Sequence, residues 1–566
     1  MSNLFAALAV ILPFQLPWSV PAEPSFPITI LGGGSGSFLP APPEGPAVPD
    51  PGLYDAVVVG AGPAGLTAAF RLSGKGRTVL LLEKEEQLGG LAAGSVLKNG
   101  IQYSRGVGYW GGALPAEAGI LKEIGLGDYK KKYAIPEPDD SYLWNGKLYT
   151  GIWEKETLSE LPASFALFKH ELLMADWDDM IPDQPFEEWK DLELDGLSAA
   201  EWIRSMPAEA AGRRDPGGRA VWRRFQKDPP SPSADPMRDV VDFMDLYCRA
   251  ALGDTSDQIS AAVFANFYIA ELKPRYTAPL GAGEISSRLE KFLVRRGRLV
   301  SIRRKATVVK LENSGRGVRV TYEYQGKLRQ ALAKYAVFAA QLKFAPKIIP
   351  DLSGREPERA AAIAGLRYAN YLVHVVFVKG HPYRASYDTW VRAADYGRRD
   401  FTDIVLGRWM DPSIRGYEGM RDFKKTPPDE RGILTIYQPF VHPSGIPYLS
   451  AGLERLHVTQ VARRAVRRML EIYSPVLRER WGTKIEVESV ETSRWPYSMH
   501  VAGPGHITRL GKVLRKPFGR IFFASSNIGA PSSEEAIFRG YCAADNILKR
   551  LDGKFRREPR ANCPME

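Results

Sequence analysis

The first residues whose types and spacing suit a definite chemistry lie in the stretch DAVVVGAGPAGLTAAFRL, residues 55–72. Its glycines follow G-x-G-x-x-G spacing, which permits a tight turn and lets the backbone approach a pyrophosphate. The apolar run before the motif predicts a strand, and the helical spacing after it predicts a helix whose N-terminus faces the phosphates. We therefore expect a dinucleotide to contact Gly60, Gly62, Pro63, Ala64 and Gly65.

A carboxylate follows at the spacing that such a site requires. The run TVLLLE predicts a second buried strand that ends at Glu83, 21 residues after Gly62. A carboxylate at this place can bind ribose hydroxyls and would repel a 2′-phosphate. Strand, turn, helix, strand and acid together favour a ligand site over an unliganded glycine turn.

The next segment, EKEEQLGGLAAG, indicates which dinucleotide is bound. It resembles the signature of FAD enzymes of the glutathione-reductase-like superfamily, especially flavin amine oxidases and their relatives, the carotenoid desaturases and protoporphyrinogen oxidases. The resemblance implies tightly held FAD, whereas a plain turn is the alternative for a Gly-Gly pair. The FAD contacts implied here are Lys84, Gly89, Gly90 and Leu91.

A capping signal marks a helix near the C-terminal end of the sequence. Ser532 and Glu535 form an S-x-x-E capping box that starts a helix at Ser533, and the helix dipole there suits anionic charge. In flavin amine oxidases the equivalent helix start faces N1 and O2 of the isoalloxazine ring. The resemblance therefore assigns Ser533, Glu535 and Ala536 to the flavin, with an unliganded helix cap as the alternative.

Several further segments, taken in order, resemble bacterial spermidine-dehydrogenase-like flavoproteins, a branch of the amine oxidase superfamily. They include ATVVKLEN, SRWPY and GRIFFASSNIGAPSSEEAI, and they cover the FAD half well and residues 116–273 poorly. The resemblance implies that Val308 supplies a backbone contact to adenine, that Gly281 and Gly283 lie near the flavin, and that Ser526 or Asn527 lies near the ribityl or pyrophosphate group. Members of this branch can carry haem, and no haem-binding motif is visible in the sequence.

Two departures from the family pattern bear on catalysis. Many amine oxidases have a lysine that bridges through water to flavin N5, and the matching position in YLVHVVFVK is Val373, beside His374. The tryptophan-proline segment continues as RWPYSMHVAGPGH, so the substrate is expected to differ. We consider His374 and His500 as candidate bases, and Trp110, Trp495 and Tyr497 as candidate aromatic walls. The alternatives are a structural histidine in each case and ordinary core packing for the rings.

The elements that must position these residues indicate an α/β fold. A Rossmann-type FAD-binding domain of the glutathione-reductase-like superfamily is expected to be interleaved with an α+β substrate domain. We expect FAD-binding parts at 53–115, 274–345 and 486–552, substrate-domain parts at 116–273 and 346–485, a Pro/Gly-rich leader or linker at 1–52 and a basic tail at 553–566. A surface excursion is expected at 213–236.

Composition limits the partners and the compartment. The 566-residue chain is 44% hydrophobic, as in soluble globular proteins, and its three cysteines follow neither a disulfide framework nor a metal or haem spacing. We therefore expect no metal site. The net charge of +11 comes from local clusters such as 295–298 and 303–305, which favour solvated surfaces, with an anionic membrane surface as the sharper alternative and no nucleic acid. The N-terminal apolar run lacks positive charge, so a cytoplasmic location is favoured over export.

Three functions remain open at this stage. The first is an FAD-dependent oxidoreductase that oxidises an amine by hydride transfer to flavin N5 and passes electrons to an unidentified acceptor. The second is an FAD-dependent desaturase or isomerase of a carotenoid-like or other lipid substrate. The third is a non-catalytic binding subunit that keeps the flavoprotein fold. The substrate is thus a small amine or an apolar lipid.

Overall fold

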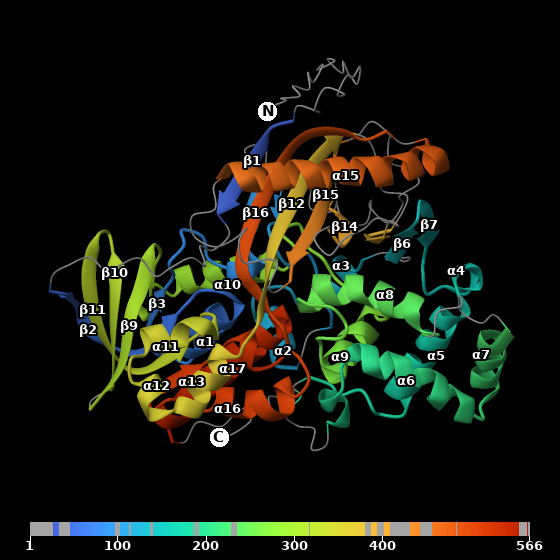
Figure 1. Cartoon of the computed structure of the whole chain (residues 1–566). Coiled ribbons are helices and arrows are strands. Elements are labelled where there is room, and N and C mark those ends of the chain that lie inside the picture. The colour runs from blue at the N-terminus through green and yellow to red at the C-terminus, as the bar shows by residue number, and fades with distance from the viewer. Residues whose placement is uncertain are drawn as a thin grey trace, which may run out of the picture.

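The computed structural model describes residues 26–32, 46–96, 102–112, 115–135, 140–184, 186, 192–227, 235–315, 317–379, 386–392, 401–407, 431–441, 455–482, 484–553 and 563. Two large sheets organise these residues (Figure 1). The sheet that contains the glycine motif lies on one side of the molecule, and a group of helices lies on the other side.

A seven-stranded sheet carries the expected dinucleotide motif. Its strand order is β8-β3-β2-β11-β10-β9, and β17 pairs with β11. The pairs among β2, β3, β8, β11 and β17 are parallel, which places the carboxyl ends of these strands along one edge. The bounds are β2 Val48–Val59, β3 Val79–Leu82, β8 Val300–Arg303, β9 Ala306–Ser314, β10 Gly317–Tyr324, β11 Lys327–Phe338 and β17 Ile521–Phe523.

Helices from distant parts of the chain cover this sheet. α1 (Pro63–Gly74) packs against α17 (Ser533–Leu551) and α10 (Gly283–Arg295). A Cβ on Gly540 of α17 would lie 2.1 Å from the carbonyl oxygen of Ala64, so the two backbones touch. Buried Arg71 and Asp545 form an ion pair of 2.8 Å between the same two helices. The motif helix is thus fixed by a segment more than 450 residues away along the chain.

An eight-stranded sheet forms the second layer, in the order β1-β16-β12-β15-β14-β13-β6-β7. One of its faces is covered by the long helix α15 (Arg455–Trp481), which crosses β16, β12 and β15 in Figure 1. Val376, Ile436, Val466 and Met469 belong to the core on that side. The bounds are β1 Ile28–Gly32, β6 Asp140–Trp144, β7 Lys147–Thr150, β12 Tyr368–Lys379, β13 Asp388–Arg392, β14 Asp403–Leu406, β15 Arg431–Phe440 and β16 Glu486–His500.

A helical region with an aromatic core packs against the eight-stranded sheet. Phe165, Phe168, Phe243, Phe264 and Tyr268 are buried in one cluster there. The bounds of the remaining elements are α2 Pro115–Glu123, α3 Tyr129–Lys132, α4 Lys155–Glu160, α5 Ala163–Trp177, α6 Ala199–Gly212, α7 Pro216–Lys227, α8 Arg238–Tyr247, α9 Ala261–Glu271, α11 Ala345–Ile348, α12 Leu352–Arg355, α13 Pro357–Ala364, α16 Gly511–Arg515, β4 Gly94–Val96 and β5 Gln102–Ser104.

The strand pairing corrects three sequence expectations. The predicted leader contains β1, which pairs in parallel with β16, and the first residues of β2. β16 belongs to the eight-stranded sheet, so a change of domain at residue 486 is placed too early. The predicted excursion at 213–236 contains α7, which packs on α5 and buries Phe225. In each case the partner of the segment, a neighbouring strand for β1 and β16 and a helix for α7, is distant in the sequence and is not shown by local periodicity.

The expectation of unpaired cysteines is also wrong. Cys542 and Cys563 form a disulfide, and both are buried, whereas Cys248 is a free buried thiol.

Two of the basic residues counted as surface charge are paired, Lys305 with Glu86 at 2.6 Å and Arg304 with Glu290. In the part of the chain that the structure describes, no helix combines the length and the apolarity needed to cross a membrane.

Candidate functional site

The glycine turn between β2 and α1 has the geometry of a phosphate-binding loop. Gly60 has a φ of +94°, which only glycine adopts easily, and a Cβ on Gly65 would lie 1.9 Å from the carbonyl oxygen of Gly60. The third glycine therefore lets α1 touch the strand. A Cβ on Gly62, in contrast, would meet no atom within 4 Å. The open space in front of Gly62, at the N-terminus of α1, suits a pyrophosphate.

Glu83 holds this turn from the end of β3. Its carboxylate accepts hydrogen bonds from the backbone N–H of Ala61 at 2.8 Å and of Glu85 at 2.9 Å. Burial raises the pKa of Glu83, and the two backbone N–H donors oppose that rise. A carboxylate can accept about four hydrogen bonds, so Glu83 retains capacity for ribose hydroxyls.

The Gly-Gly segment closes over the same turn. Gly89 and Gly90 both have positive φ, and the N–H of Gly89 donates to the carbonyl of Ala61 at 2.8 Å. Beside Gly89 lies Ser286 of α10, whose buried hydroxyl has no hydrogen-bond partner among the described residues. An open glycine cradle, a carboxylate and an orphan hydroxyl together fit the FAD that the sequence resemblance implies. The nearby side chain of Lys84 ion-pairs with Glu85 at 3.6 Å.

The start of α17 forms as the capping signal predicts. Ser532 is the N-cap, and its hydroxyl accepts from the N–H of Glu535 at 3.0 Å. The Glu535 carboxylate, which is fully buried, pairs with Arg539 at 2.6 Å. Glu534 accepts from the backbone N–H of Gly111 at 3.0 Å, which connects the helix start to the 106–111 loop. Contacts of Ser533 and Ala536 with a flavin stay a prediction.

The other residues implied by resemblance have structural contacts of their own. The Asn527 side-chain oxygen accepts from the N–H of Leu342 at 3.0 Å and from the hydroxyl of Tyr368 at 3.1 Å, so it joins the two sheets. Ser526 begins the short helical turn that contains Asn527. Val308 is buried in β9. Cβ atoms on Gly281 and Gly283 would lie 2.6 Å from the carbonyl of Val107 and 2.7 Å from the N–H of Gly94. Their cofactor contacts stay predictions.

The face of the eight-stranded sheet that is turned away from α15 is called the inner face. Paired strand residues share a face, and residues alternate along a strand. The register therefore places one row on this face, running from Val373 to Tyr437, Asp403, Trp390 and Tyr142. A second row contains Val375, Thr435, Val405, Asp388 and Asp140. Tyr371 and Trp495 form a further pair.

The inner face meets the glycine loops through an aromatic cluster. Trp495, Tyr371 and Val373 are buried together and pack against Tyr437 and Leu91. Trp495 donates its ring N–H to the carbonyl of Arg105 at 2.6 Å. The N–H of Val107 donates to the carbonyl of Leu91 at 3.1 Å. Trp495 therefore lies in the cluster on which Leu91 of the 89–91 segment packs, and its role as an aromatic wall stays a prediction.

Sequence reasoning missed the tyrosines that complete this wall. Tyr437 donates its hydroxyl to the carbonyl of Gly106 at 2.7 Å. Gly108 lies against Tyr437 and Tyr387, because a Cβ there would be 2.9 Å and 3.4 Å from their hydroxyl oxygens. Tyr109 packs edge-on against Tyr387 with ring centroids 6.1 Å apart. Tyr437 lies in the apolar strand β15, whose alternation was a signal in the sequence. Tyr109 and Tyr387 lie outside the strands, so only the tertiary fold brings them to Tyr437.

Two buried aspartates also lie on the inner face. Asp388 and Asp403 are 1% and 3% exposed, and Oδ1 of Asp388 has no hydrogen-bond partner among the described residues. Asp403 accepts from the hydroxyl of Thr402 at 2.5 Å. Burial, and then the charges of Asp403 and Asp140, raise the pKa of Asp388 well above its ordinary value. Burial is also the main reason that the pKa of Asp403 rises to about 7.

Neither predicted histidine base lies on the inner face. His374 is on the α15 side, where its ring nitrogens contact Thr492 Oγ1 and Gln438 Oε1, both at 2.9 Å. His500 contacts the carbonyl of Gly529 at 2.9 Å. Burial lowers the pKa of His374 to about 4 and that of His500 to about 3, with His506 contributing to the second shift. Both rings therefore have structural contacts of their own, and their catalytic roles stay predictions.

Trp110 and Tyr497 pack in clusters other than that of Trp495, and their roles as aromatic walls stay predictions. Trp110 is buried in the core with Tyr129, Tyr133 and Tyr276. Tyr497 packs at the edge of the seven-stranded-sheet core, with the Lys343 ammonium 2.7 Å from its ring centroid. Burial lowers the pKa of Lys343 to about 8, and Lys347 contributes. Tyr497 also has a φ of +52°, where the register between β12 and β16 shifts, and Met499 packs against the inner-face cluster again.

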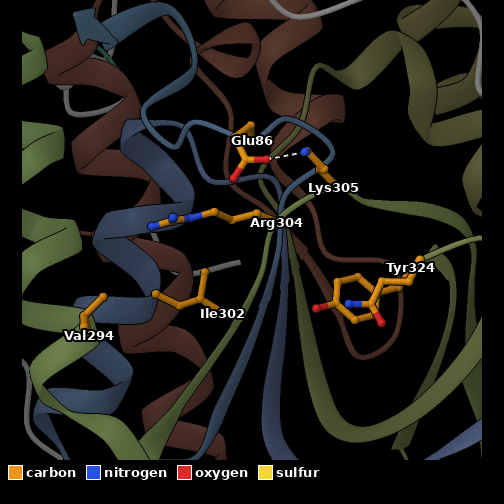
Figure 2. A pocket seen from close by; sticks show the side chains of 7 residues that line it. Glu86, Val294, Ile302, Arg304, Lys305 and Tyr324 are labelled. Atoms are coloured by element: carbon orange, nitrogen blue, oxygen red, sulfur yellow. Dashed lines mark ion pairs between the residues drawn. The ribbon is translucent and has the colours of Figure 1, made fainter. Parts of the chain in front are cut away.

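A pocket of about 410 Å³ lies beside the glycine-motif sheet, between the ends of α10 and β8 and the β10–β11 turn (Figure 2). None of the predicted site residues lines it. The pocket is lined by Glu86, Val294, Ile302, Arg304, Lys305, Tyr324 and Gln325. Both of its cationic side chains are occupied in the ion pairs described above, so the pocket offers no obvious anion site.

Comparison with known proteins gives a family. The model described as flavin containing amine oxidoreductase matches residues 63–548. Among curated proteins, an L-amino acid dehydrogenase of Synechocystis sp. is 29% identical over 172 residues, or 28% of this chain and 35% of that protein. The 15-cis-phytoene desaturase of Narcissus pseudonarcissus is 40% identical over 80 residues, 14% of each chain. The matched segments thus span about a third or less of these relatives.

Solved structures share the fold over nearly their whole length. Cyclohexylamine oxidase from Brevibacterium oxydans superposes with a TM-score of 0.58 at 16% identity, over 88% of this chain and all of that one. A fatty acid isomerase from P. acnes gives 0.56 at 13% identity, over 88% and 99%. These likenesses confirm the α/β architecture expected from the sequence.

Proposed function

Because this chain belongs to the family of flavin-containing amine oxidoreductases, we propose that it oxidises the carbon–nitrogen bond of an amine. Family membership makes FAD its cofactor and places it among the FAD-dependent oxidoreductases. When bound, FAD accepts the hydride at N5, while the protein supplies binding, orientation and electrostatics. The spermidine-dehydrogenase-like branch stays a prediction from the sequence.

The composition of the inner face is the observation that favours an amine over a lipid. Asp388 and Asp403 lie there in the same buried region as Asp140 and Glu271, and Arg275 is their principal cationic neighbour. The hydroxyls of Tyr437 and Tyr387 lie beside Gly108 of the 106–111 loop, and Tyr109 packs edge-on against Tyr387. Aromatic faces and carboxylates both attract cations, whereas burying carboxylates beside an apolar chain is costly. A substrate that arrives as an ammonium ion suits this face.

The chain's own groups then have distinct tasks. The Glu83 carboxylate and the glycine loops would hold the adenosine and pyrophosphate parts of FAD. Trp495 and the tyrosine wall would orient the amine and exclude water from its C–H bond. The sequence resemblance matches Val373 to the family lysine, and valine would offer no ammonium group to a water at that position.

An anaerobic absorbance titration tests the proposal. The holoenzyme is mixed with monoamines, polyamines, amino acids and a solubilised polyene, and the flavin band is followed. We expect at least one amine to bleach the band. Bleaching by the polyene alone would support a lipid desaturase, and bleaching by nothing, with FAD bound, would support a binding subunit.

Substitution of the aromatic wall gives a matched comparison. Trp495→Phe removes the ring N–H that donates to Arg105 and should slow bleaching by the amine. Trp110→Phe changes the same residue type in the core, away from the inner face, and should leave the bleaching rate unchanged. Equal effects of the two substitutions would contradict the placement of the substrate.

A further inference from the structure

The buried aspartates of the inner face form a pair set apart from the salt bridges around it. Asp388 pairs in register with Val405, two residues beyond Asp403 on the same strand, so the two carboxyl groups are diagonal neighbours on one face. The nearest guanidinium, that of Arg275, is held by Asp140 at 3.1 Å and by Glu271. Oδ1 of Asp388 has no hydrogen-bond partner among the described residues.

The surroundings of the pair do not supply a compensating charge for both carboxylates. The carboxylates of Asp140 and Glu271 oppose ionisation, and the guanidinium of Arg275 favours ionisation of Asp388. The other titratable groups that face the pair are the hydroxyls of Tyr109, Tyr371, Tyr387 and Tyr437. Burial raises the pKa of each of these hydroxyls, so they stay neutral. Two like charges this deeply buried favour a state in which the pair retains a proton.

The pair is connected to the aromatic wall by the sheet itself. Asp403 is the register partner of Tyr437, and Tyr437 is in turn the partner of Val373. Tyr437 packs against the cluster that contains Trp495. The carboxyl pair therefore lies one strand behind the side chains assigned to substrate binding, and no histidine of the described residues is on this face to serve as the base.

We propose that Asp388 and Asp403 act as one carboxyl pair that takes up the proton released when a substrate ammonium becomes the neutral amine. The inference rests on the proposed amine oxidation, in which the nitrogen lone pair must be free before the C–H bond is broken. The N–H bond of the ammonium breaks and an O–H bond of the pair forms, so the substrate becomes neutral and the pair loses one negative charge. No electrons are transferred in this step. The pair accepts the proton from the substrate nitrogen and does not contact the C–H bond.

The pH dependence of flavin reduction tests whether the carboxyl pair takes up the proton of the substrate ammonium. In the wild-type holoenzyme, with an amine whose own pKa lies well above the range studied, we expect the apparent second-order rate of bleaching to rise with pH and to level off near neutrality. In Asp403→Asn we expect the levelling to disappear, because only free neutral amine reacts. The rate should then rise about tenfold per pH unit up to the pKa of the amine.

A matched variant controls for burial. Asp245 is a mostly buried aspartate of α8 whose pKa is also raised by burial, and its carboxylate accepts from Ser256. Asp245→Asn should keep the wild-type profile. An unchanged profile in Asp403→Asn, with FAD content and thermal stability equal to those of the wild type, would overturn the proposal.

An infrared titration tests the pair without any substrate. The wild-type holoenzyme should show the carbonyl stretch of a protonated carboxyl group that disappears as the pH rises through neutrality, and Asp403→Asn or Asp388→Asn should lack that transition. Absence of such a band in the wild type refutes the pair even if amines reduce the flavin. A titrating band without bleaching by any amine keeps the proton-holding pair but refutes the amine reaction.

Discussion

Alanine substitutions at two glycines of the same loop should have different effects on folding and on FAD binding. We expect Gly62→Ala to fold normally and bind FAD poorly, whereas Gly65→Ala should weaken both. The distinction follows from the space around each position. A Cβ on Gly62 meets nothing within 4 Å, and its φ of −73° is ordinary for alanine. A Cβ on Gly65 lies 1.9 Å from the Gly60 carbonyl oxygen.

The magnitudes come from that geometry. An ordinary contact begins at 3.4 Å, so α1 of Gly65→Ala must move by about 1.5 Å (3.4 − 1.9) or distort the turn. Overpacking of this kind costs about 1–3 kcal/mol. Gly62→Ala should leave the apoprotein unchanged or stabilise it by about 0.5 kcal/mol, because alanine restricts the unfolded chain. A methyl group in the pyrophosphate space should weaken FAD binding at least tenfold, or about 1.4 kcal/mol.

Thermal unfolding of the apoproteins measures the first effect, and quenching of FAD fluorescence on titration measures the second. Wild-type FAD affinity in Gly62→Ala would refute the assignment of the open space to the pyrophosphate. Equal losses of apoprotein stability in the two variants would show that the difference in packing has no consequence.

Two further expectations concern stability. Burial lowers the folded-state pKa of His374, His500 and His506 to about 4, 3 and 4, below the ordinary 6.5, so their contribution is complete above pH 6.5 and is lost as the pH falls toward 4. Each of these histidines should lower the free energy of unfolding by about 2 kcal/mol at pH 5 relative to pH 8. His374→Gln should therefore make the free energy of urea unfolding less dependent on pH. Replacement of a solvent-exposed histidine would leave that dependence unchanged. Cys563→Ser should lower stability by about 3 kcal/mol, the value for a loop of 21 residues, and reductant should lower the melting temperature of the wild type but not of this variant.

The cofactor half was readable from the sequence because its signals are local. The glycines, Glu83 and the Ser532 cap each act over a few residues, and β9, β10 and β11 have clear strand patterns. The structure forms the glycine turn, the strand before Glu83 and the helix after Ser532 near the predicted places. Physical requirements of a turn or a cap leave few alternative residues, so the sequence alone identifies them.

The substrate side could not be read in the same way. His374 and Val373 are adjacent in β12, yet alternation places them on opposite faces, and only the position of α15 shows which face is which. Asp388 and Asp403 become neighbours through the pairing of β13 with β14. Cys542 and Cys563 likewise meet through tertiary packing. Such contacts depend on strand order and helix placement, which composition and spacing do not encode locally.

The contact between α1 and α17 has a consequence for how the protein is made. The motif helix is synthesised before the helix that packs on it, and 474 residues separate Arg71 of α1 from its ion-pair partner Asp545 of α17. Domains generally fold as units during synthesis, starting from the N-terminus. Here α1 cannot pack against α17 until the segments between them have been synthesised, so the apolar surface of α1 lacks this partner in the meantime. The cofactor-binding unit is therefore completed by a contact between segments that are far apart in the order of synthesis.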